Sequence, residues 1–396
     1  MGKTKLLFCG NALPMEIVKT MNLSVAGKKY EIELLNAMNM KLGSSLEIVS
    51  LAFINNFEQT KEKNLYLFKD KKFHYIPSTH YPVIRDFLKN INFFIYLLKW
   101  CRDNSTYQQN IILLNSSLGK CLCLMLIKII YKTQIFSLTI DTPFPNIKSN
   151  NLIYKAYLYI IFKVGHKLLK YFDGIIVLNC NVISALNLKI PFIISRVGYK
   201  KEQSDKTLIY KKQFNKIKVK KIFFAGTLIK YNGIVEIIEG FLLLNNMNYE
   251  LHLYGYGDLE SYVKEIAKKN EKIFFHGMVD NDLLFDYMQG ADLLINARKT
   301  DNLANDFGFP SKLIEYMLSG NPVLTTHFKS LPYEYLDFLH IIETEDALGI
   351  KLGIEKVFNT DPNILNSMST KGVDFIKENN NWNCITSEIL EFIKTV

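Results

Sequence analysis

The chain has 396 residues, a formal net charge of +10 at pH 7, 48% hydrophobic residues and 22% charged residues. This length is enough for two or three domains, and this apolar content excludes a disordered chain, a collagen-like chain and a small disulfide scaffold. The excess of positive charge favours an anionic partner, which is a nucleic acid, a membrane surface or a phosphorylated substrate.

The cysteines and the apolar segments indicate a reduced cytoplasmic protein. Six cysteines are scattered along the chain, at positions 9, 101, 121, 123, 180 and 384, and none has the spacing of a metal site. The first five residues lead into a short apolar run that lacks the pattern of a secretory signal. The most apolar runs are shorter than the ~18 uncharged residues that a membrane-spanning helix requires. We therefore expect neither a metal nor a transmembrane segment.

The first half of the chain alternates short apolar runs with longer stretches of helical periodicity, which is typical of βαβ units in a parallel sheet. Strands are predicted near residues 6–9, 46–51, 65–68, 111–114, 135–139 and 174–178, with helices near 27–40, 85–102, 118–132 and 153–171. A polar stretch with nine lysines follows at residues 200–221, which is typical of an exposed linker.

The same alternation restarts after the linker. Strands are predicted near residues 222–225, 249–254, 273–275, 292–295 and 323–325, with helices near 234–244, 259–268, 283–289 and 310–319. This pattern predicts an α/β fold with two tandem Rossmann-like, doubly wound parallel-sheet domains that face a cleft. We expect the domains to be residues 1–200 and 222–380, joined by the basic linker 201–221, with a C-terminal helix at 381–396 packing back on the first domain. Ligands of such sheets bind at the carboxyl ends of the strands.

The most informative stretch runs from residue 296 to residue 323. A strand ends just before Arg298, and a loop leads to a helix that Pro310 opens. The amides of Ser311 and Lys312 then lie at a positive helix end, which binds anions, and Arg298 and Lys312 add positive charge there. Glu315, about one turn further on, is placed to accept two hydrogen bonds from a vicinal diol such as a ribose. A merely capped helix is an equally good explanation for any single residue, but it explains the combination poorly.

Glycine and aspartate patterns elsewhere are less specific. Gly10 follows the first strand and Gly27 starts a helix, so backbone amides there are able to approach phosphates, although an ordinary turn and helix cap remain an alternative. The pair Gly255-x-Gly257 lacks the third glycine of a dinucleotide fingerprint, which argues against a nicotinamide enzyme. Asp280-x-Asp282 resembles a metal motif, but its position at a helix start favours capping.

The run FGFPSKLIEYMLSGNPV at residues 307–323 resembles the donor-nucleotide motif of GT-B glycosyltransferases of the family-4 (group 1) retaining type, in particular of the bacterial capsular and lipopolysaccharide biosynthesis branch. The segments FAGTL at 224–228, LYGYG at 253–257 and FHGMV at 275–279 agree in order and spacing. The segments SVAGKKYE at 24–31 and DGIIV at 173–177 resemble the N-terminal domain. The resemblance implies the GT-B fold and transfer from a nucleotide sugar, here taken as a UDP-sugar, with no metal or other cofactor.

The resemblance also implies roles for individual residues. Glu315 matches the second Glu of a Glu-x7-Glu motif that holds the ribose, whereas Phe307 stands in place of the first Glu. Thr227 and Asn232 stand where many members have an Arg and a Lys that hold the diphosphate. We therefore expect Arg298 and Lys312 to take over the diphosphate charge.

The complete donor site expected in this way is Gly27, Gly226, Thr227, Asn232, Gly255, Met278, Val279, Arg298, Pro310, Ser311, Lys312 and Glu315. Met278 and Val279 are placed near the base. Asp141 is the candidate catalytic residue, because many relatives carry a His-Asp pair near this position and this chain has Ile140-Asp141. Asp141 would orient the acceptor or take its proton, and a turn-capping role is at least as good an explanation.

The predicted helix at 153–171 is both basic and aromatic. Its residues Lys155, Lys163, His166, Lys167 and Lys170 fall within an arc of about 120°. The helix is either an interfacial helix that touches anionic lipid or a core helix with a solvated lysine face. A polyprenyl-pyrophosphate acceptor would account for both the positive charge and the many aromatic residues. We therefore predict a cytoplasmic enzyme at the inner face of the cell membrane.

The expected function is that of a retaining glycosyltransferase that passes a sugar from a UDP-sugar to a growing cell-surface glycan or lipid-linked oligosaccharide. Two alternatives remain: a catalytically inactive GT-B partner subunit, and a GT-B enzyme similar to UDP-sugar epimerases. Nucleic acid is not expected as a partner, because the sequence contains no recognisable nucleic-acid-binding module.

Overall fold

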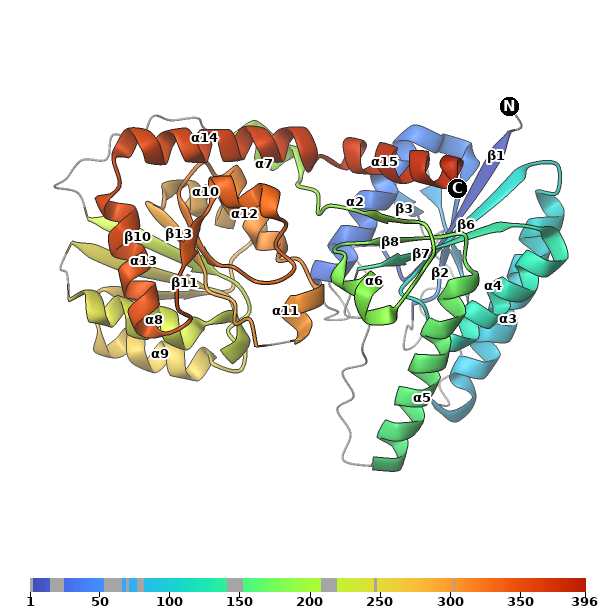
Figure 1. Cartoon of the computed structure of the whole chain (residues 1–396), viewed down its shortest axis with the longest axis horizontal. Helices are drawn as coiled ribbons and strands as arrows, with labels where there is room; N and C mark the ends of the chain where they lie inside the picture. Colours follow the sequence, from blue (N-terminus) through green and yellow to red (C-terminus); the bar gives the residue numbers. More distant parts are fainter. Residues whose placement is uncertain are drawn as a thin grey trace. The chain divides into compact units, whose positions relative to one another are not determined.

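The computed structural model describes residues 3–14, 25–52, 66–68, 71–76, 82–140, 152–207, 219–245, 248–301 and 303–396. The chain divides into two compact units (Figure 1). The first unit comprises Met1–Arg196 and Trp382–Val396, and the second comprises Val197–Asn381.

The first unit is built on a parallel sheet of seven strands in the order β5-β2-β1-β6-β7-β8-β9. The strands are β1 (Thr4–Gly10), β2 (Leu46–Ser50), β5 (His74–Tyr75), β6 (Gln108–Leu114), β7 (Gln134–Thr139), β8 (Gly174–Val177) and β9 (Phe192–Ile194). A separate antiparallel pair consists of β3 (Tyr66–Phe68) and β4 (Lys71–Lys72). The central strands read as nearly continuous apolar runs because helices cover both faces of the sheet.

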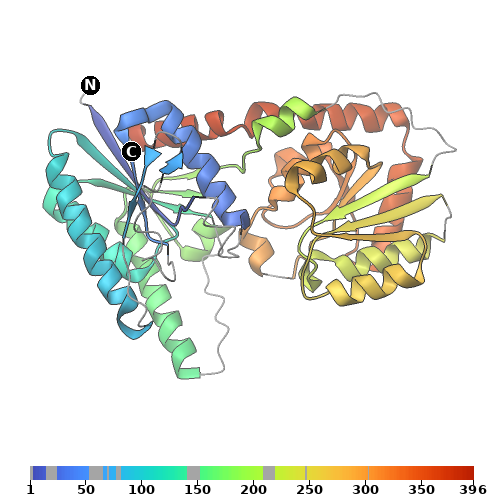
Figure 2. The same cartoon turned by 180° about the vertical axis from the view of Figure 1, so that it is seen from behind.

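Helices lie on both faces of this sheet (Figures 1 and 2). One face carries α2 (Val25–Leu42) and α15 (Trp382–Thr395), which pack on each other through an edge-to-face contact of the Tyr30 and Trp382 rings at 5.2 Å. The other face carries α3 (Pro82–Asp103), α4 (Leu118–Tyr131) and α5 (Leu152–Leu168). The short helix α6 (Asn181–Leu186) and the 3-10 turns Gly43–Ser45 and Leu169–Tyr171 complete the helical segments described in this unit.

The second unit has a parallel sheet of six strands in the order β12-β11-β10-β13-β14-β15. The strands are β10 (Lys220–Ala225), β11 (Tyr249–Tyr254), β12 (Ile273–Gly277), β13 (Leu293–Asn296), β14 (Val323–Thr326) and β15 (His340–Ile342). The helices are α7 (Lys201–Lys206), α8 (Ile234–Leu244), α9 (Glu260–Lys269), α10 (Asn281–Gly290), α11 (Leu303–Phe307), α12 (Ser311–Leu318), α13 (Ala347–Asn359) and α14 (Pro362–Asn379), with 3-10 turns at Lys230–Asn232 and Tyr333–Phe338.

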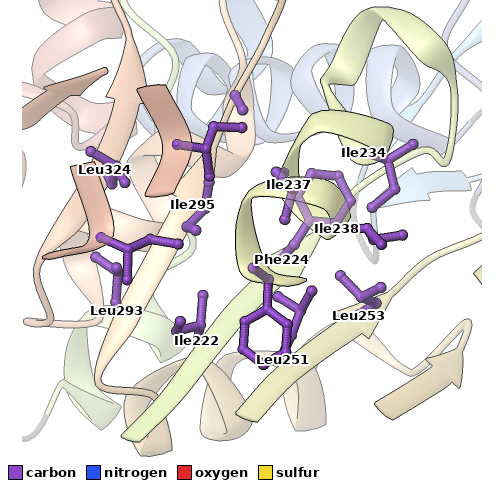
Figure 3. Close-up of a cluster of buried hydrophobic side chains, with 14 of the residues drawn as sticks. Ile222, Phe224, Ile234, Ile237, Ile238, Leu251, Leu253, Leu293, Ile295 and Leu324 are labelled. Atoms are coloured by element: carbon purple, nitrogen blue, oxygen red, sulfur yellow. The ribbon is translucent and has the colours of Figure 1, made fainter. Parts of the chain in front are cut away.

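The core of the second unit lies between the sheet and helix α8 (Figure 3). Ile234, Ile237 and Ile238 of α8 follow helical spacing and point at alternate residues of the strands, such as Leu251 and Leu253 of β11. Helix α13 packs beside α8 on the same face. This burial fixes the central strands and therefore the edge of the sheet at which they end.

The expected fold class is confirmed, because both units are doubly wound parallel α/β sheets. The residues expected as a linker include two ordered segments, however. Residues 201–206 form α7, where Thr207 Oγ1 donates a hydrogen bond to the carbonyl of Leu318 at 3.1 Å, and residues 220–221 begin β10. Residues 208–218 of the expected linker lie outside the described part of the chain.

Several elements were not expected from the sequence, chiefly β9, β15, α13 and α14. The buried face of α14 includes Ser369 and Gly372, and that of α13 includes Gly349 and Gly353. Small residues on a buried face permit close packing, as where a Cβ on Gly240 of α8 would meet the Ala347 carbonyl at 2.7 Å. They weaken the apolar periodicity that reveals a helix in a sequence.

We predict that Ile238→Ala lowers the free energy of unfolding of the second unit by about 3 kcal/mol, because a fully buried side chain leaves a cavity. Leu243→Ala on the same helix is the matched control: this side chain is 51% exposed, so we expect a change below about 0.5 kcal/mol. Urea unfolding monitored by far-UV circular dichroism measures the free energy of unfolding of both variants. Equal losses in the two variants would contradict this core.

Candidate functional site

The candidate site lies where the order of the second sheet reverses. From β10 the chain turns to α8 and β11 on one side, and β13 borders β10 on the other side. In open parallel sheets such a switch point leaves a crevice at the carboxyl ends of the two central strands, and ligands bind there. Two loops start at these ends, one at residue 226 after β10 and one at residue 297 after β13.

The backbones of these loops approach each other so closely that only glycine fits. Gly255, with φ +133°, follows β11, and a Cβ there would lie 1.9 Å from the carbonyl oxygen of Gly226. Gly233, with φ +71°, precedes α8, and a Cβ there would lie 2.0 Å from the carbonyl oxygen of Ala297. The left-handed conformation and the contacts both exclude a side chain. The segment between β10 and α8 is therefore held against the loop after β11 at its start and against the loop after β13 at its end.

Thr227 and Asn232, which stand where related enzymes carry cations, stabilise the turn between β10 and α8. Asn232 Nδ2 donates a hydrogen bond to the carbonyl of Thr227 at 2.7 Å, which closes the turn before α8. Thr227 itself is exposed at the edge of the sheet. Both residues lie in the loop after β10 at the switch point, and neither carries charge.

Arg298 supplies a cation directly after β13. Its Nη1 donates a hydrogen bond to Asn305 Oδ1 at 3.1 Å, and Thr326 Oγ1 fixes its backbone by donating to the Arg298 carbonyl at 2.6 Å. Burial lowers the pKa of Arg298 to about 10, so the guanidinium stays charged at neutral pH. Within the described ranges no carboxylate pairs with it. A largely buried cation without a counter-ion is costly unless a ligand provides the negative charge.

Helix α12 follows in the chain, and the side chain of its Tyr316 interacts electrostatically with Arg298. Pro310 is the N-cap, one residue before the helix, rather than the first helical residue expected from the sequence. Its carbonyl accepts the first helical hydrogen bond from the Leu313 amide at 2.9 Å. The amides of Ser311 and Lys312 have no acceptor within the helix, because they belong to its first turn. They are therefore directed out of the positive end of α12.

Lys312 and Glu315 form an ion pair along the first turns of α12. Lys312 Nζ lies 2.5 Å from Glu315 Oε2, and the Glu315 side chain is only 8% exposed. The sequence predicts that these two residues contact different parts of a nucleotide, and it does not predict that they contact each other. The spacing i, i+3 on one helix explains the contact.

Tyr316 is a residue of this site that sequence reasoning missed. Its hydroxyl accepts a hydrogen bond from the Ala225 amide at 2.7 Å and donates one to the Ala225 carbonyl at 3.1 Å. The side chain is 1% exposed, and burial raises the pKa of Tyr316, so the hydroxyl remains a donor at neutral pH. Tyr316 therefore ties α12 to the last residue of β10. A tyrosine within an amphipathic helix carries no sequence signal of such a role.

The remaining expected residues are placed less centrally. Met278 and Val279 follow β12 at the same edge of the sheet, and Met278 is 77% exposed after Gly277, whose φ is +67°. Phe307, which replaces the first motif Glu, is 6% exposed and ends α11.

Two expected residues lie elsewhere. Gly27 is in the first turn of α2 in the first unit, and Asp141 lies outside the described residues. Among the side chains that the structure describes, no group of three or more His, Cys, Asp or Glu residues is placed to hold a metal ion.

Part of the second unit matches a known protein family. Residues 219–347 match the family model described as glycosyl transferases group 1. No curated protein sequence matches the chain significantly.

Similar solved structures cover almost the whole chain. A glycosyltransferase from Rickettsia africae has 14% identity and a TM-score of 0.67, covering 100% of this chain and 99% of that one. Anabaena HepE in complex with UDP-glucose has 13% identity and a TM-score of 0.61, covering 99% and 100%. Sucrose-phosphate synthase from Thermosynechococcus elongatus has 11% identity and a TM-score of 0.66, covering 99% and 98%.

At these identities the solved structures establish the fold, which is the GT-B fold. The switch-point site of the second unit falls within the matched group 1 glycosyltransferase domain. Together, the domain match and the fold indicate that the protein is a glycosyltransferase, which is an enzyme of the transferase class.

Two neighbouring cations of this site provide a stability test. Arg298→Met removes a charge that has no carboxylate partner in the described structure, so we expect the free energy of unfolding to change by less than about 1 kcal/mol or to rise. Lys299 Nζ instead lies 2.8 Å from Glu236 Oε1, with both side chains 18% exposed. Lys299→Met leaves this carboxylate unpaired, and we expect a loss of about 2 kcal/mol. Urea unfolding measures both. A larger loss for Arg298→Met than for Lys299→Met would show that Arg298 is chiefly structural.

Proposed function

We propose that this protein is a retaining glycosyltransferase that transfers a sugar from a UDP-sugar to a growing cell-surface glycan or a lipid-linked oligosaccharide, as in the synthesis of bacterial capsule or lipopolysaccharide. The observation that carries the proposal is the Arg298 guanidinium, which pairs with no carboxylate among the described residues and follows β13 at the switch point of the matched glycosyltransferase domain. The diphosphate of a nucleotide would supply the negative charge that the Arg298 guanidinium lacks, and it would fit the crevice at the switch point.

In this proposal Arg298 and the amides of Ser311 and Lys312 receive the diphosphate. Transfer breaks the bond between the sugar and the diphosphate, and negative charge develops on the departing oxygen. Fixed donors and a cation aimed at that oxygen lower the barrier because they need no reorganisation during the reaction. These groups perform the task that a divalent cation performs in other transferases, so the proposal includes no metal.

Glu315 would bind the ribose. Its buried carboxylate has two oxygens, and one is held by Lys312 at 2.5 Å. A ribose presents two adjacent hydroxyl groups, which are able to donate to a single carboxylate. Lys312 balances the charge of Glu315 with its side chain, while its backbone amide is one of the two that receive the diphosphate. The base would then lie towards Met278 and Val279 at the end of β12.

The choice of uridine is supported by a structural neighbour rather than by a residue of this chain. Anabaena HepE, of the same fold, was solved with UDP, with UDP and glucose, and with UDP-glucose. Retention of the anomeric configuration is supported by the resemblance of residues 307–323 to the family-4 motif. We propose Asp141 as the residue that orients the acceptor.

We also propose that the enzyme associates peripherally with the inner face of the cell membrane. In the described ranges no helix is long and apolar enough to cross a bilayer. Large apolar side chains nevertheless stand exposed on three adjacent helices of the first unit, among them Phe87 (67%) on α3, Ile129 (75%) on α4 and Ile160 (60%) on α5. Lys163 and Lys167 are exposed on α5 as well. This combination matches an anionic lipid surface.

One residue of the expected basic helix face does not belong to that surface. His166 is 8% exposed, and its Nδ1 lies 2.9 Å from the Phe162 carbonyl. Burial lowers the pKa of His166, so it contributes no positive charge at neutral pH. It was expected to be solvated because its helical angle matches the lysines, but α5 packs against α4 along this side.

The donor site is tested by calorimetric titration with UDP, GDP, CDP and ADP in EDTA. We expect UDP to bind, and Glu315→Gln or Arg298→Met to weaken the affinity at least about tenfold, since each removes a charged hydrogen-bond partner. Glu343→Gln is the control, because the Glu343 side chain is 79% exposed in the same unit. Equal UDP affinity in all four proteins would refute the site, and binding of none of the nucleotides would favour an inactive partner subunit.

Membrane association is tested by flotation with vesicles containing phosphatidylglycerol at low salt. We expect the wild type to float and the double variant Phe87→Ser, Ile129→Ser to remain in the bottom fraction, because both side chains leave the apolar face. Leu243→Ser, an exposed change on α8 of the second unit, is the control and should float. Wild-type protein that remains in the bottom fraction would contradict membrane association.

A further inference from the structure

Three lysines gather around the carboxyl end of β1 in the first unit. Lys28 of α2 donates a hydrogen bond from Nζ to the Asn11 carbonyl at 2.9 Å. Lys89 of α3 donates from Nζ to the carbonyl of Leu51, which follows β2. Lys120 is the third residue of α4, which follows β6. The strands β2 and β6 flank β1 in the sheet, and Lys120 interacts electrostatically with Lys89 and Glu31, as Lys28 does with Glu31, so the three lysines from three elements are neighbours.

The acidic residue of this cluster does not pair with the lysines. Glu31 is 2% exposed, and its Oε1 accepts a hydrogen bond from the Asn11 amide at 2.7 Å. The same oxygen occupies the place of a side chain on Gly10, 2.0 Å from where a Cβ would lie. Within the described residues neither Glu31 nor any of the three lysines forms an ion pair. The neighbouring Arg85 and Asp86 neutralise each other at 3.4 Å.

The charges in this cluster do not balance. Burial raises the pKa of Glu31 to about 7, so this single carboxyl is only partly ionised at neutral pH beside the three lysines. Burial, and next the charge of Lys120, lower the pKa of Lys89 to about 8. Burial lowers the pKa of Lys120 as well. Like charges crowded out of water cost stability, and such arrangements are typical of ligand sites.

The position of the cluster also indicates a ligand site. In the first sheet the order reverses between β1 and β6, and the chain leaves β1 towards β2 on the other side. Cys9, next to the end of β1, pairs with Leu113, next to the end of β6. This is the switch point at which open parallel sheets bind ligands. It corresponds in the first unit to the Arg298 site of the second.

We propose that Lys28, Lys89 and Lys120 bind a phosphate or pyrophosphate group of the acceptor. This inference rests on the proposed transferase function, since it names the chemical class of the second substrate. Three lysines beside a single, partly ionised carboxyl suit a multiply charged phosphate group better than a singly charged carboxylate. The point-like ammonium groups suit tetrahedral phosphate oxygens approached from several sides.

The test is a calorimetric titration of the full chain with inorganic pyrophosphate in EDTA, first saturated with UDP so that the donor site is filled. We expect pyrophosphate to bind the UDP-saturated protein, and Lys89→Gln or Lys120→Gln to weaken that binding at least tenfold with no change in UDP affinity. Lys99→Gln is the matched control, because Lys99 is an exposed lysine on α3, the helix that carries Lys89. Thermal unfolding of Lys120→Gln should show a midpoint no lower than that of the wild type, since removal of the charge relieves repulsion.

Three other outcomes overturn the proposal, and a fourth bears on the donor function. If pyrophosphate fails to bind in the presence of UDP, or binds Lys120→Gln as tightly as the wild type, the cluster holds no acceptor phosphate. If pyrophosphate binds only the UDP-free protein and Lys120→Gln weakens UDP binding, the phosphate belongs to the donor. A Lys120→Gln variant that unfolds shows a structural lysine. Failure of UDP to bind, with Lys120-dependent pyrophosphate binding intact, would instead refute the donor function alone.

Discussion

The arrangement of strands in each sheet is the constraint on which the sites of this protein depend. In both units the chain runs outward in opposite directions from two central strands, β1 and β6 in the first and β10 and β13 in the second. Helices from neighbouring central strands then cover opposite faces, and the carboxyl ends between them receive only loops. Arg298 lies at one of these points and Lys120 at the other. Neither side chain forms an ion pair with a carboxylate in the described chain. Burial lowers the pKa of both.

Much of the fold follows from the sequence because the central strands are strongly apolar and the connecting helices are periodic. The runs at 222–225 and 249–254 correspond to β10 and β11, and the helical stretch at 234–244 coincides with α8. The prediction is incomplete where burial uses small residues. Helix α14 buries Ser369 and Gly372, so its apolar stripe is too thin to recognise without knowing what packs against it.

The candidate donor site was accessible from the sequence to the extent that its residues are neighbours in the chain. One loop and one helix contain its main residues, which are Arg298, Ser311, Lys312 and Glu315. Their roles can therefore be predicted from their order in the sequence. The double hydrogen bond of Tyr316 to Ala225 joins residues 91 positions apart, and no local pattern announces it. The lysine cluster is a stronger case, since Lys28, Lys89 and Lys120 meet only because β2, β1 and β6 are adjacent in the sheet.

At the two switch points lies positive charge for which the described residues supply no counter-ion, and we propose that this charge binds anionic groups of the substrates. A crystal structure of the full chain grown with UDP and pyrophosphate, with anomalous or difference density for phosphorus, tests this claim most directly. We predict a diphosphate against Arg298 and the first-turn amides of α12, and a second phosphate group among Lys28, Lys89 and Lys120. Phosphate density bound elsewhere, with both clusters bare at saturating ligand, would contradict the account.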